Sequence, residues 1–418
     1  MNGDRLHIAI AGAGIAGLSL ALLLQQRSIS CAIYELRPSN VPKPGALMLA
    51  PNALRILDEI GLFTQIRTKG YNFDTIHFKD FAGQTIDRFL MGSEAQYGFH
   101  AIRIHRETVI AELKNLARER AIPIHFEKQI SSIIHENEAG TTFQFSDGSV
   151  GHASLLIGAD GIHSAVRNYI CPEYNPEYSG QLAISAVIQQ NSLSLPLNIR
   201  QSLPAIFVGR SRPFLMLPQS FDGSEIVVAT QFRYPEQDKA GWLSLATDQH
   251  KLRSLLKEGI GEWQALVQSP LEDMRYDAIS IWPYYALPTL PSWISRGKRV
   301  ALIGDAAHAI SPTGGQGACQ AIEDAFTMAV LLSGLPSFDL LGEGLAYWEK
   351  VRRERIEKVK TLTLQLGNSR LPQHEREQLP EGHYWNSGEQ PDLHWLYGEP
   401  VGDEMSQCLA ISELFGPD

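Results

Sequence analysis

The sequence predicts an α/β protein: a Rossmann-like, discontinuous domain with an inserted, mainly β domain and a C-terminal helical region. Three glycine-containing segments support this prediction, namely Gly12-Ala13-Gly14-Ile15-Ala16-Gly17, Gly158-Ala159-Asp160-Gly161, and Gly304-Asp305 followed by Gly314-Gly315-Gln316-Gly317. Each begins directly after a short apolar run that suits a buried parallel strand. Segments far apart in the chain are therefore expected to share one sheet.

The first segment has the order of a dinucleotide-binding unit. Leu6–Ala11 is predicted as a strand, residues 18–26 as a helix and Ser30–Tyr34 as a second strand ending at Glu35. Glycines permit the tight turn, the close approach of a pyrophosphate and the packing of helix on strand, and an acidic residue after the second strand binds a ribose diol. The expected cofactor residues here are Gly12, Gly14, Ala16, Gly17 and Glu35. A purely structural turn is the alternative, and the motif does not separate FAD from NAD.

The third segment favours a flavin. Residues 299–303 form another strand-like run, so Asp305 is expected just beyond a strand end, where ligands of such sheets bind. Pro312 and the glycines after it precede an apolar helix predicted from Ala318 to Leu332. A helix N-terminus directed at a flavin ring would stabilise negative charge on its N1–O2 edge. The alternative is a flexible loop that caps a structural helix.

With these motifs in order, the chain resembles the FAD-dependent monooxygenases of the aromatic-hydroxylase type, which include salicylate and para-hydroxybenzoate hydroxylases. The middle motif extends from Leu155 to Arg167, and weaker matches lie at residues 51–57, 104–108 and 347–353. The similarity covers roughly residues 6–365, and its specificity comes from the order and spacing of the motifs.

The resemblance implies roles for individual residues. Glu35 would bind the adenosine ribose, Arg106 the phosphate or ribityl region, and Asp305 a ribityl hydroxyl. Asp160 would help hold the flavin and a transiently docked nicotinamide. Gly315, Gly317 and Ala318 would present backbone to the isoalloxazine, with Pro312 beside its reactive face. Ala46 is a further expected cofactor-binding residue. Arg106 as a surface helix residue and Asp160 as a simple turn-former remain the alternatives.

The implied function is that of an FAD- and NAD(P)H-dependent monooxygenase. Such an enzyme inserts one oxygen atom of O2 into an organic substrate, here aromatic or polyketide/terpenoid-like, through a flavin C4a-hydroperoxide. The sequence has no second dinucleotide fingerprint, so nicotinamide is expected to dock transiently as NADH or NADPH. No residue is assigned a catalytic role. The alternatives are a flavin oxidase, dehydrogenase or halogenase on the same fold, or a non-catalytic binding protein.

Two departures from the family concern the substrate. Ser185 lies where several salicylate- and urate-type relatives have Arg, and Leu217 lies where many have Tyr before Pro. An apolar wall favours neutral ligands and penalises an unpaired carboxylate. The sequence thus favours a bulky neutral substrate over salicylate or urate, unless Arg210 or Arg212 supplies a cation.

Composition agrees with an enzyme of this class. The chain has 418 residues with 44% hydrophobic content, and its formal charge of −10 argues against a nucleic-acid partner. The four cysteines show no metal-ligand or disulfide pattern, and no signal peptide or integral membrane segment is recognised. We expect no metal, a cytoplasmic location and a monomer or homodimer. The predicted domains are 1–70, 97–175 and 290–368 for FAD, 71–96 and 176–289 for substrate, and 369–418 as a C-terminal extension.

Overall fold

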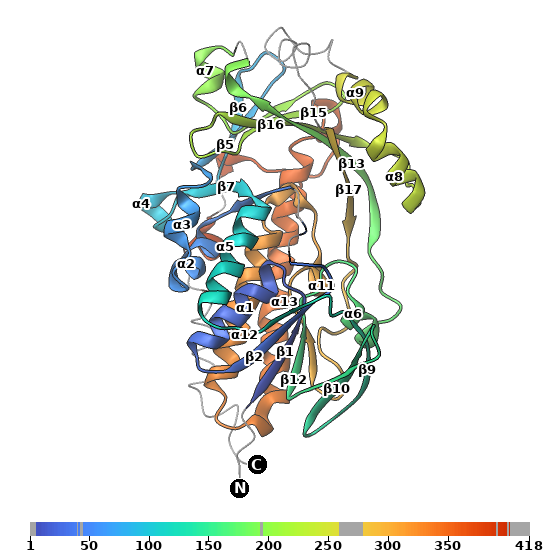
Figure 1. The fold of residues 1–418 in the computed structure, drawn as a ribbon. Coiled ribbons are helices and arrows are strands. Elements are labelled where there is room, and N and C mark those ends of the chain that lie inside the picture. The colour runs from blue at the N-terminus through green and yellow to red at the C-terminus, as the bar shows by residue number, and fades with distance from the viewer. Residues whose placement is uncertain are drawn as a thin grey trace.

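A five-stranded parallel sheet forms the centre of the cofactor-binding half in this computed structural model, which describes residues 6–39, 41, 45–192, 195–258, 279–389, 392–398 and 401. Its strands, in spatial order, are β18 (Val300–Leu302), β12 (Leu155–Gly158), β1 (His7–Ala11), β2 (Ser30–Glu35) and β8 (Ile124–Phe126). Figure 1 shows this sheet in the lower part of the molecule. All three glycine segments follow strands of this one sheet, as the sequence predicts.

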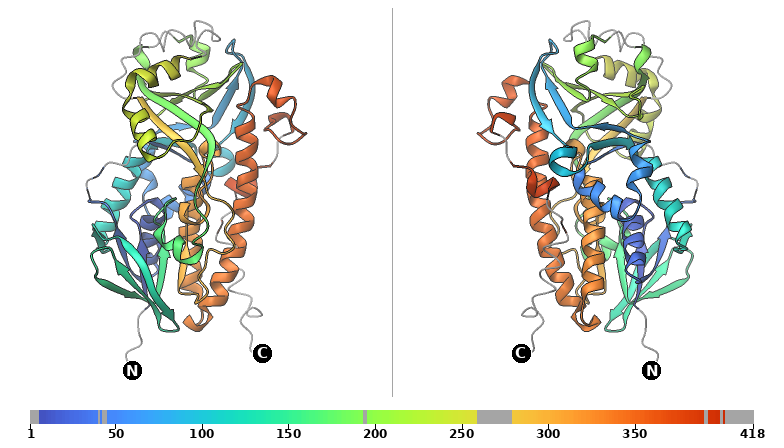
Figure 2. Two further views of the ribbon diagram at one scale, coloured as in Figure 1. Left: turned by 90° about the vertical axis from the view of Figure 1, so that its right-hand side faces the viewer. Right: turned by 90° about the vertical axis from the view of Figure 1, so that its left-hand side faces the viewer.

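Apolar helices cover the sheet. α1 (Ile15–Gln26) connects β1 to β2 and is buried from Ala16 to Leu24, because it is enclosed by the sheet and by two other helices. These helices are α5 (Arg106–Glu119) and α12 (Gly317–Gly334). The 28-residue helix α13 (Leu341–Asn368) packs on α12 and runs from the lower half of the molecule toward the upper sheet (Figure 2). A helix buried on all sides needs an apolar sequence all round, and α1 has one.

Two small antiparallel sheets and several short helices complete this half. The first sheet contains β3 (Ala46–Leu49), β7 (Ala101–His105) and β4 (Tyr71–Phe73), and the second contains β11 (Val150–Ala153), β10 (Gly140–Phe145) and β9 (Ile130–Asn137). The short helices are α2 (Pro51–Glu59), α3 (Phe63–Arg67), α4 (Glu94–Tyr97), α6 (Ala165–Ile170) and α11 (Asp305–His308).

A seven-stranded sheet spans the upper half (Figure 1). Its order is β17 (Ile279–Ala286), β13 (Glu177–Gln189), β16 (Glu225–Arg233), β15 (Pro213–Pro218), β14 (Ala205–Val208), β5 (Thr75–Lys79) and β6 (Thr85–Leu90). Alternate residues belong to two separate cores: Val228 and Met216 pack in the upper core, whereas Leu215 and Leu217 pack in the large lower core. We call the second side the inner face. The mixed α/β fold with a mainly β region is confirmed, and the exact domain boundaries remain a prediction.

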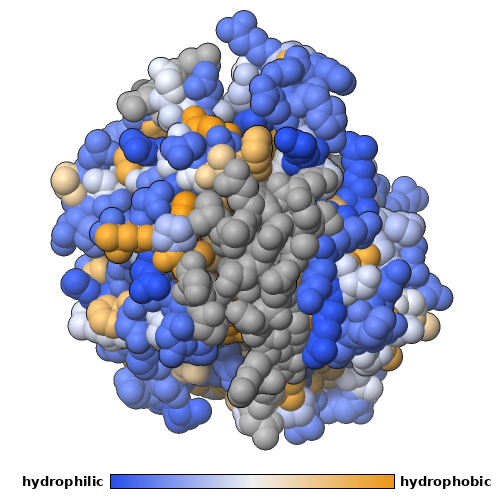
Figure 3. All heavy atoms as spheres, turned by 90° about the horizontal axis from the view of Figure 1, so that it is seen from above, coloured by the Kyte–Doolittle hydropathy of each residue, from blue (hydrophilic) through white to orange (hydrophobic). Residues whose placement is uncertain are grey.

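Three helices contribute to the upper core on the other side of this sheet: α7 (Leu197–Arg200), α8 (Lys239–Thr247) and α9 (Gln249–Lys257). The amphipathic sequence pattern from Leu252 to Val267 predicts a helix there, and α9 covers it as far as Lys257. Residues 259–267 lie outside the described part. Seen from above, the described surface is mostly hydrophilic with scattered apolar groups (Figure 3). Within the described ranges, the structure contains no helix with the length and apolar character needed to span a membrane.

The C-terminal segment returns to the large sheet after α13 (Figure 2). Trp385 packs edge-to-face on Phe89 of β6, with ring centroids 4.8 Å apart, and its indole N–H donates to the carbonyl of Arg88. Two further short helices in this segment are α14 (Gln373–Arg376) and α15 (His394–Tyr397). Residues 402–418 of the expected extension lie outside the described part.

Candidate active site

The turn between β1 and α1 brings backbone N–H groups to one edge of the parallel sheet. A Cβ atom on Gly17 would lie 2.0 Å from the carbonyl oxygen of Gly12, so only glycine permits this contact between helix and turn. Gly14 precedes the helix in an extended conformation, and no described side chain caps the first turn. The first N–H groups of a 12-residue helix are therefore available to an anion.

Glu35 closes the same turn from the end of β2. Its carboxylate accepts hydrogen bonds from the backbone N–H groups of Ala13 at 2.8 Å and Arg37 at 3.0 Å, and the residue is 7% exposed. An acidic side chain at the end of the second strand is the group that accepts hydrogen bonds from a ribose diol in dinucleotide-binding units. The structure thus brings Glu35 to the glycine turn.

Asp160 lies at the end of the neighbouring strand β12. Its Oδ2 accepts hydrogen bonds from the N–H groups of Ala165 and Val166, whereas its buried Oδ1 has no hydrogen-bond partner among the described residues. Burial raises the pKa of the Asp160 carboxyl, although these hydrogen bonds oppose the shift. A Cβ atom on Gly12 would lie 3.0 Å from the Asp160 Cα, so the first two motifs are in contact.

Asp305 starts α11 directly after the third strand, β18, and its side chain is exposed. The preceding Gly304 has a φ of 61° and its N–H donates to Asp324 at 2.7 Å. A Cβ atom on Gly304 would be 3.2 Å from the Cβ of Ala16. Gly12, Asp160 and Asp305 therefore share the carboxyl edge of three adjacent parallel strands, where ligands of this sheet type bind.

The loop from Pro312 to Gly317 leads into α12 on the same side of the molecule. Ser311 caps a short turn at Pro312–Gly314, and Gly315 has a left-handed φ of 65°. A Cβ atom on Gly315 would meet Met91 Cε at 2.9 Å and Met48 Cβ at 3.4 Å. Gly317 and Ala318 then begin an 18-residue helix whose N-terminus is partly exposed.

Ala46 and Arg106 lie next to each other beside this loop. Ala46 pairs with His105 across β3 and β7, and the Arg106 N–H donates to the Gly45 carbonyl at 2.9 Å. The half-buried Arg106 side chain has a buried Nε without a partner in the described structure. β3 also contributes Met48, which reaches the Gly315 turn.

Sequence reasoning missed a buried ionic network behind these residues. Glu323 accepts hydrogen bonds from Arg352 at 2.7 Å and Arg355 at 2.6 Å, and Asp324 accepts from Arg352 at 2.8 Å and His308 at 2.6 Å. Burial raises the pKa of each acid, but the cations outweigh burial and hold both pKa values at about 2. Because Asp324 also binds the Gly304 N–H, the network holds the backbone before Asp305. The sequence signal for this network was the pair of adjacent acidic residues, Glu323 and Asp324, within the otherwise apolar helix α12.

Ser185 and Leu217, which the sequence predicts as part of a substrate wall, lie on the inner face of the large sheet. Ser185 pairs with Ala229 on β16, and Leu217 belongs to the lower core. Arg212 lies 4.4 Å above the Phe232 ring and donates to the Leu255 carbonyl of α9 on the outer side. Arg210 is exposed and stacks on Phe81. Arg210 and Arg212 therefore bind other groups and do not supply a cation next to Ser185.

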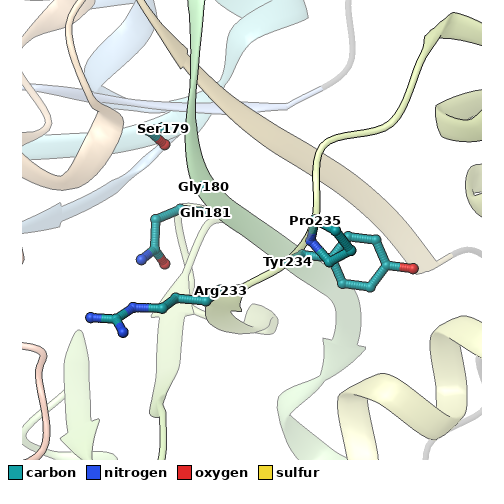
Figure 4. Close-up of a pocket in the computed structure, with 6 residues that line it drawn as sticks. All are labelled: Ser179, Gly180, Gln181, Arg233, Tyr234 and Pro235. Carbon is teal, nitrogen blue, oxygen red and sulfur yellow. The ribbon is translucent and has the colours of Figure 1, made fainter.

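An open hollow lies where β13 is interrupted by a bulge. It is lined by Ser179, Gly180, Gln181, Arg233, Tyr234 and Pro235. Arg233 and Gln181 extend to one side of the sheet, whereas Tyr234 extends to the other (Figure 4). The hollow therefore does not gather these groups around one ligand.

Comparison with known proteins identifies the class of site. The family model described as FAD binding domain matches residues 5–359. The chain belongs to this family. The prediction of an FAD-dependent monooxygenase of the aromatic-hydroxylase type is confirmed at the level of the family and its curated relatives.

Relatives with named activities extend over most of the chain. A 3-amino-4-hydroxybenzoate 2-monooxygenase from Streptomyces cremeus is 27% identical and covers 97% of this chain and 98% of its own. A 6-hydroxynicotinate 3-monooxygenase from Bordetella bronchiseptica is 28% identical and covers 85% and 90%, respectively. A salicylate hydroxylase–substrate complex matches with a TM-score of 0.78 at 23% identity over 98% of each chain, which supports the fold.

The residues at the sheet edge suit FAD. The turn at Gly12–Gly17 leaves no room for a side chain at Gly17, and the open N-terminus of α1 can accept a pyrophosphate. The buried Oδ1 of Asp160 and Nε of Arg106 lack partners within the described residues, so each can bind a polar group of a cofactor. Exposed Asp305 and the N-terminus of α12 lie further along the same edge.

Proposed function

We propose that this chain is an FAD- and NAD(P)H-dependent monooxygenase that hydroxylates a small aromatic substrate. The observation that carries the proposal is the convergence of Gly12, Asp160 and Asp305 on one edge of the parallel sheet, with the Pro312–Gly317 loop beside them. Relatives named for hydroxylating 3-amino-4-hydroxybenzoate and 6-hydroxynicotinate support the substrate class.

In this proposal, different side chains and backbone groups bind different parts of the cofactor. Glu35 holds the adenosine ribose, the turn at Gly12, Gly14, Ala16 and Gly17 binds the pyrophosphate, and Asp305 binds ribityl hydroxyls. When bound, FAD supplies hydride acceptance from NAD(P)H and activation of O2, chemistry that amino-acid side chains do not provide.

The chain also controls the surroundings of the reacting groups. With FAD bound, the N–H groups of Gly317 and Ala318 at the start of α12 would stabilise negative charge that develops on the flavin. Met48 and Met91, which pack at Gly315, contribute an apolar wall that keeps water from this region. Arg106 and Asp160 offer their unpartnered polar atoms to the central part of the cofactor.

Reconstitution with FAD followed by turnover tests this function. The purified protein should bind FAD with a flavin absorbance spectrum, and one or more small aromatics should stimulate NAD(P)H oxidation. Mass analysis should show a product with one added oxygen atom, formed in proportion to NAD(P)H consumed. Stimulated oxidation that yields only hydrogen peroxide across the substrate panel would identify an oxidase instead. Failure of the folded protein to bind FAD would exclude the proposal.

A further inference from the structure

The first residues after α13 place a buried cation between the cofactor loop and the large sheet. Arg370 Nη2 donates to the carbonyl of Thr313 at 2.7 Å, and Nη1 donates to Gln231 Oε1 on β16 at 3.0 Å. The residue is only 8% exposed. Arg370 therefore connects Thr313 of the cofactor loop with the large sheet.

The end of α13 is built to hold this position. A Cβ atom on Gly314 would lie 2.4 Å from the Thr363 hydroxyl, and the Thr313 hydroxyl donates to the Thr363 carbonyl at 3.2 Å. The Arg370 N–H donates to the Gly367 carbonyl at 3.1 Å, which continues the last turn of the helix. The guanidinium is thus attached to the cofactor loop through a packed helix end.

Arg370 is buried without a carboxylate partner in the described ranges. Its partners are a backbone carbonyl and an amide, and its buried Nε has no hydrogen-bond partner there. Burial lowers the pKa of Arg370, and the nearby Tyr284 is buried as well. By contrast, the fully buried Arg352 binds two carboxylates. A buried cation with neutral partners costs free energy unless an anion joins it.

The sheet register puts this cation close to Ser185. Gln231 pairs with Ala183, which is two residues before Ser185 on β13, and Ser185 itself pairs with Ala229. Two residues along a strand correspond to about 6.8 Å. The inner-face neighbours Ala183, Ala229 and Val227 carry no charge, so Arg370 provides the positive charge beside this part of the wall.

We propose that Arg370 is a specificity-determining residue that binds the carboxylate of an aromatic acid between the Pro312–Gly317 loop and the inner face of the large sheet. This inference rests on the proposed function for its aromatic substrate. An arginine has five N–H donors, and the two bonds to Thr313 and Gln231 leave three for an incoming carboxylate. On this proposal the wall near Ser185 has a cation, and an aromatic acid takes the place of the neutral substrate expected from the sequence.

Equilibrium binding to the FAD-loaded protein tests this role without requiring turnover. The probes are 3-amino-4-hydroxybenzoate, 6-hydroxynicotinate and salicylate, each compared with its carboxamide by titration of the flavin spectrum. Wild-type protein should bind at least one acid at least about tenfold more tightly than its amide. Arg370→Met should weaken binding of that acid about ten- to a hundredfold and change amide binding less than about threefold.

Two variants separate charge from packing. Arg370→Lys should retain part of the preference for the acid. Arg210→Met, which removes an exposed cation at the turn between β14 and β15 of the same sheet, should leave it unchanged. Equal binding of acid and amide by wild type, or equal weakening of both in Arg370→Met, would overturn the proposal. A loss of FAD affinity matching the loss of acid affinity would show that Arg370 only supports the loop. If acids bind selectively but are not hydroxylated, the proposed function fails while the role of Arg370 stands.

Discussion

The two glycines that flank the start of α1 should respond differently to alanine. A methyl group at Gly17 would lie 2.0 Å from the Gly12 carbonyl oxygen, a backbone atom, and 3.1 Å from Ile10 Cγ2. Ordinary contacts lie near 3.5 Å, so helix and turn would have to separate by more than about 1 Å. Such overpacking costs about 1–3 kcal/mol, or a fall of several degrees in Tm. Gly17→Ala should therefore lose both stability and FAD binding.

Gly14→Ala is the matched comparison. Its backbone is extended at φ −85°, and a Cβ atom would lie 4.0 Å from its nearest neighbour, the Ala159 carbonyl oxygen. The folded chain should tolerate this methyl group at a cost of at most about 1 kcal/mol for an alanine at the N-cap. FAD affinity should nevertheless fall at least about tenfold, because the methyl group occupies the approach of the pyrophosphate to the backbone.

Thermal unfolding without FAD and flavin titration distinguish the two effects. The expected result is a lowered Tm for Gly17→Ala only, with weakened FAD binding in both variants. Wild-type FAD affinity in Gly14→Ala would refute the placement of the pyrophosphate at this turn. A wild-type Tm in Gly17→Ala would refute the steric reasoning.

Three further predictions concern acidic residues. Asp305→Ala should weaken FAD binding about ten- to a hundredfold without lowering the apoprotein Tm, whereas Asp58→Ala, which removes an exposed carboxylate on α2, should change neither quantity. Glu35→Ala should weaken FAD binding yet leave the rate of flavin reduction at saturating FAD near wild type; a collapse of that rate with unchanged affinity would contradict its adenosine-side role. Because the pKa of Glu323 is lowered from 4.5 to about 2, its contribution to stability is complete above pH 4.5 and is lost as the pH falls toward 2. Urea unfolding from pH 7 to 3 should show this loss as a fall in the free energy of unfolding. In Glu323→Gln the free energy of unfolding should depend less steeply on pH.

Local patterns predicted much of the fold and of the cofactor edge. Apolar runs before Gly12, Gly158 and Gly304 identified three strands, and the glycine spacing identified the helices that follow. Glu35 ends β2 and Asp305 follows β18, so the path of the chain determines where each side chain lies. Their contacts with the cofactor stay a prediction.

Contacts between distant segments were beyond this reasoning. Arg370 reaches Gln231 only because α13 carries the chain from the cofactor-binding half to the large sheet, and no local motif encodes that distance. The partners of Arg352 are likewise set by the packing of α13 on α12. The position of a cation near Ser185 also depends on tertiary structure, so the substrate preference drawn from Ser185 alone stays a prediction, and the role proposed for Arg370 opposes it.

The source of the oxygen in the product tests the central claim most directly. FAD-loaded protein should be supplied with NAD(P)H, an aromatic acid that it binds, and 18O-labelled O2 in unlabelled water. The account predicts a hydroxylated product that contains one labelled oxygen atom. Label confined to hydrogen peroxide, or a product oxygen derived from water, would contradict it.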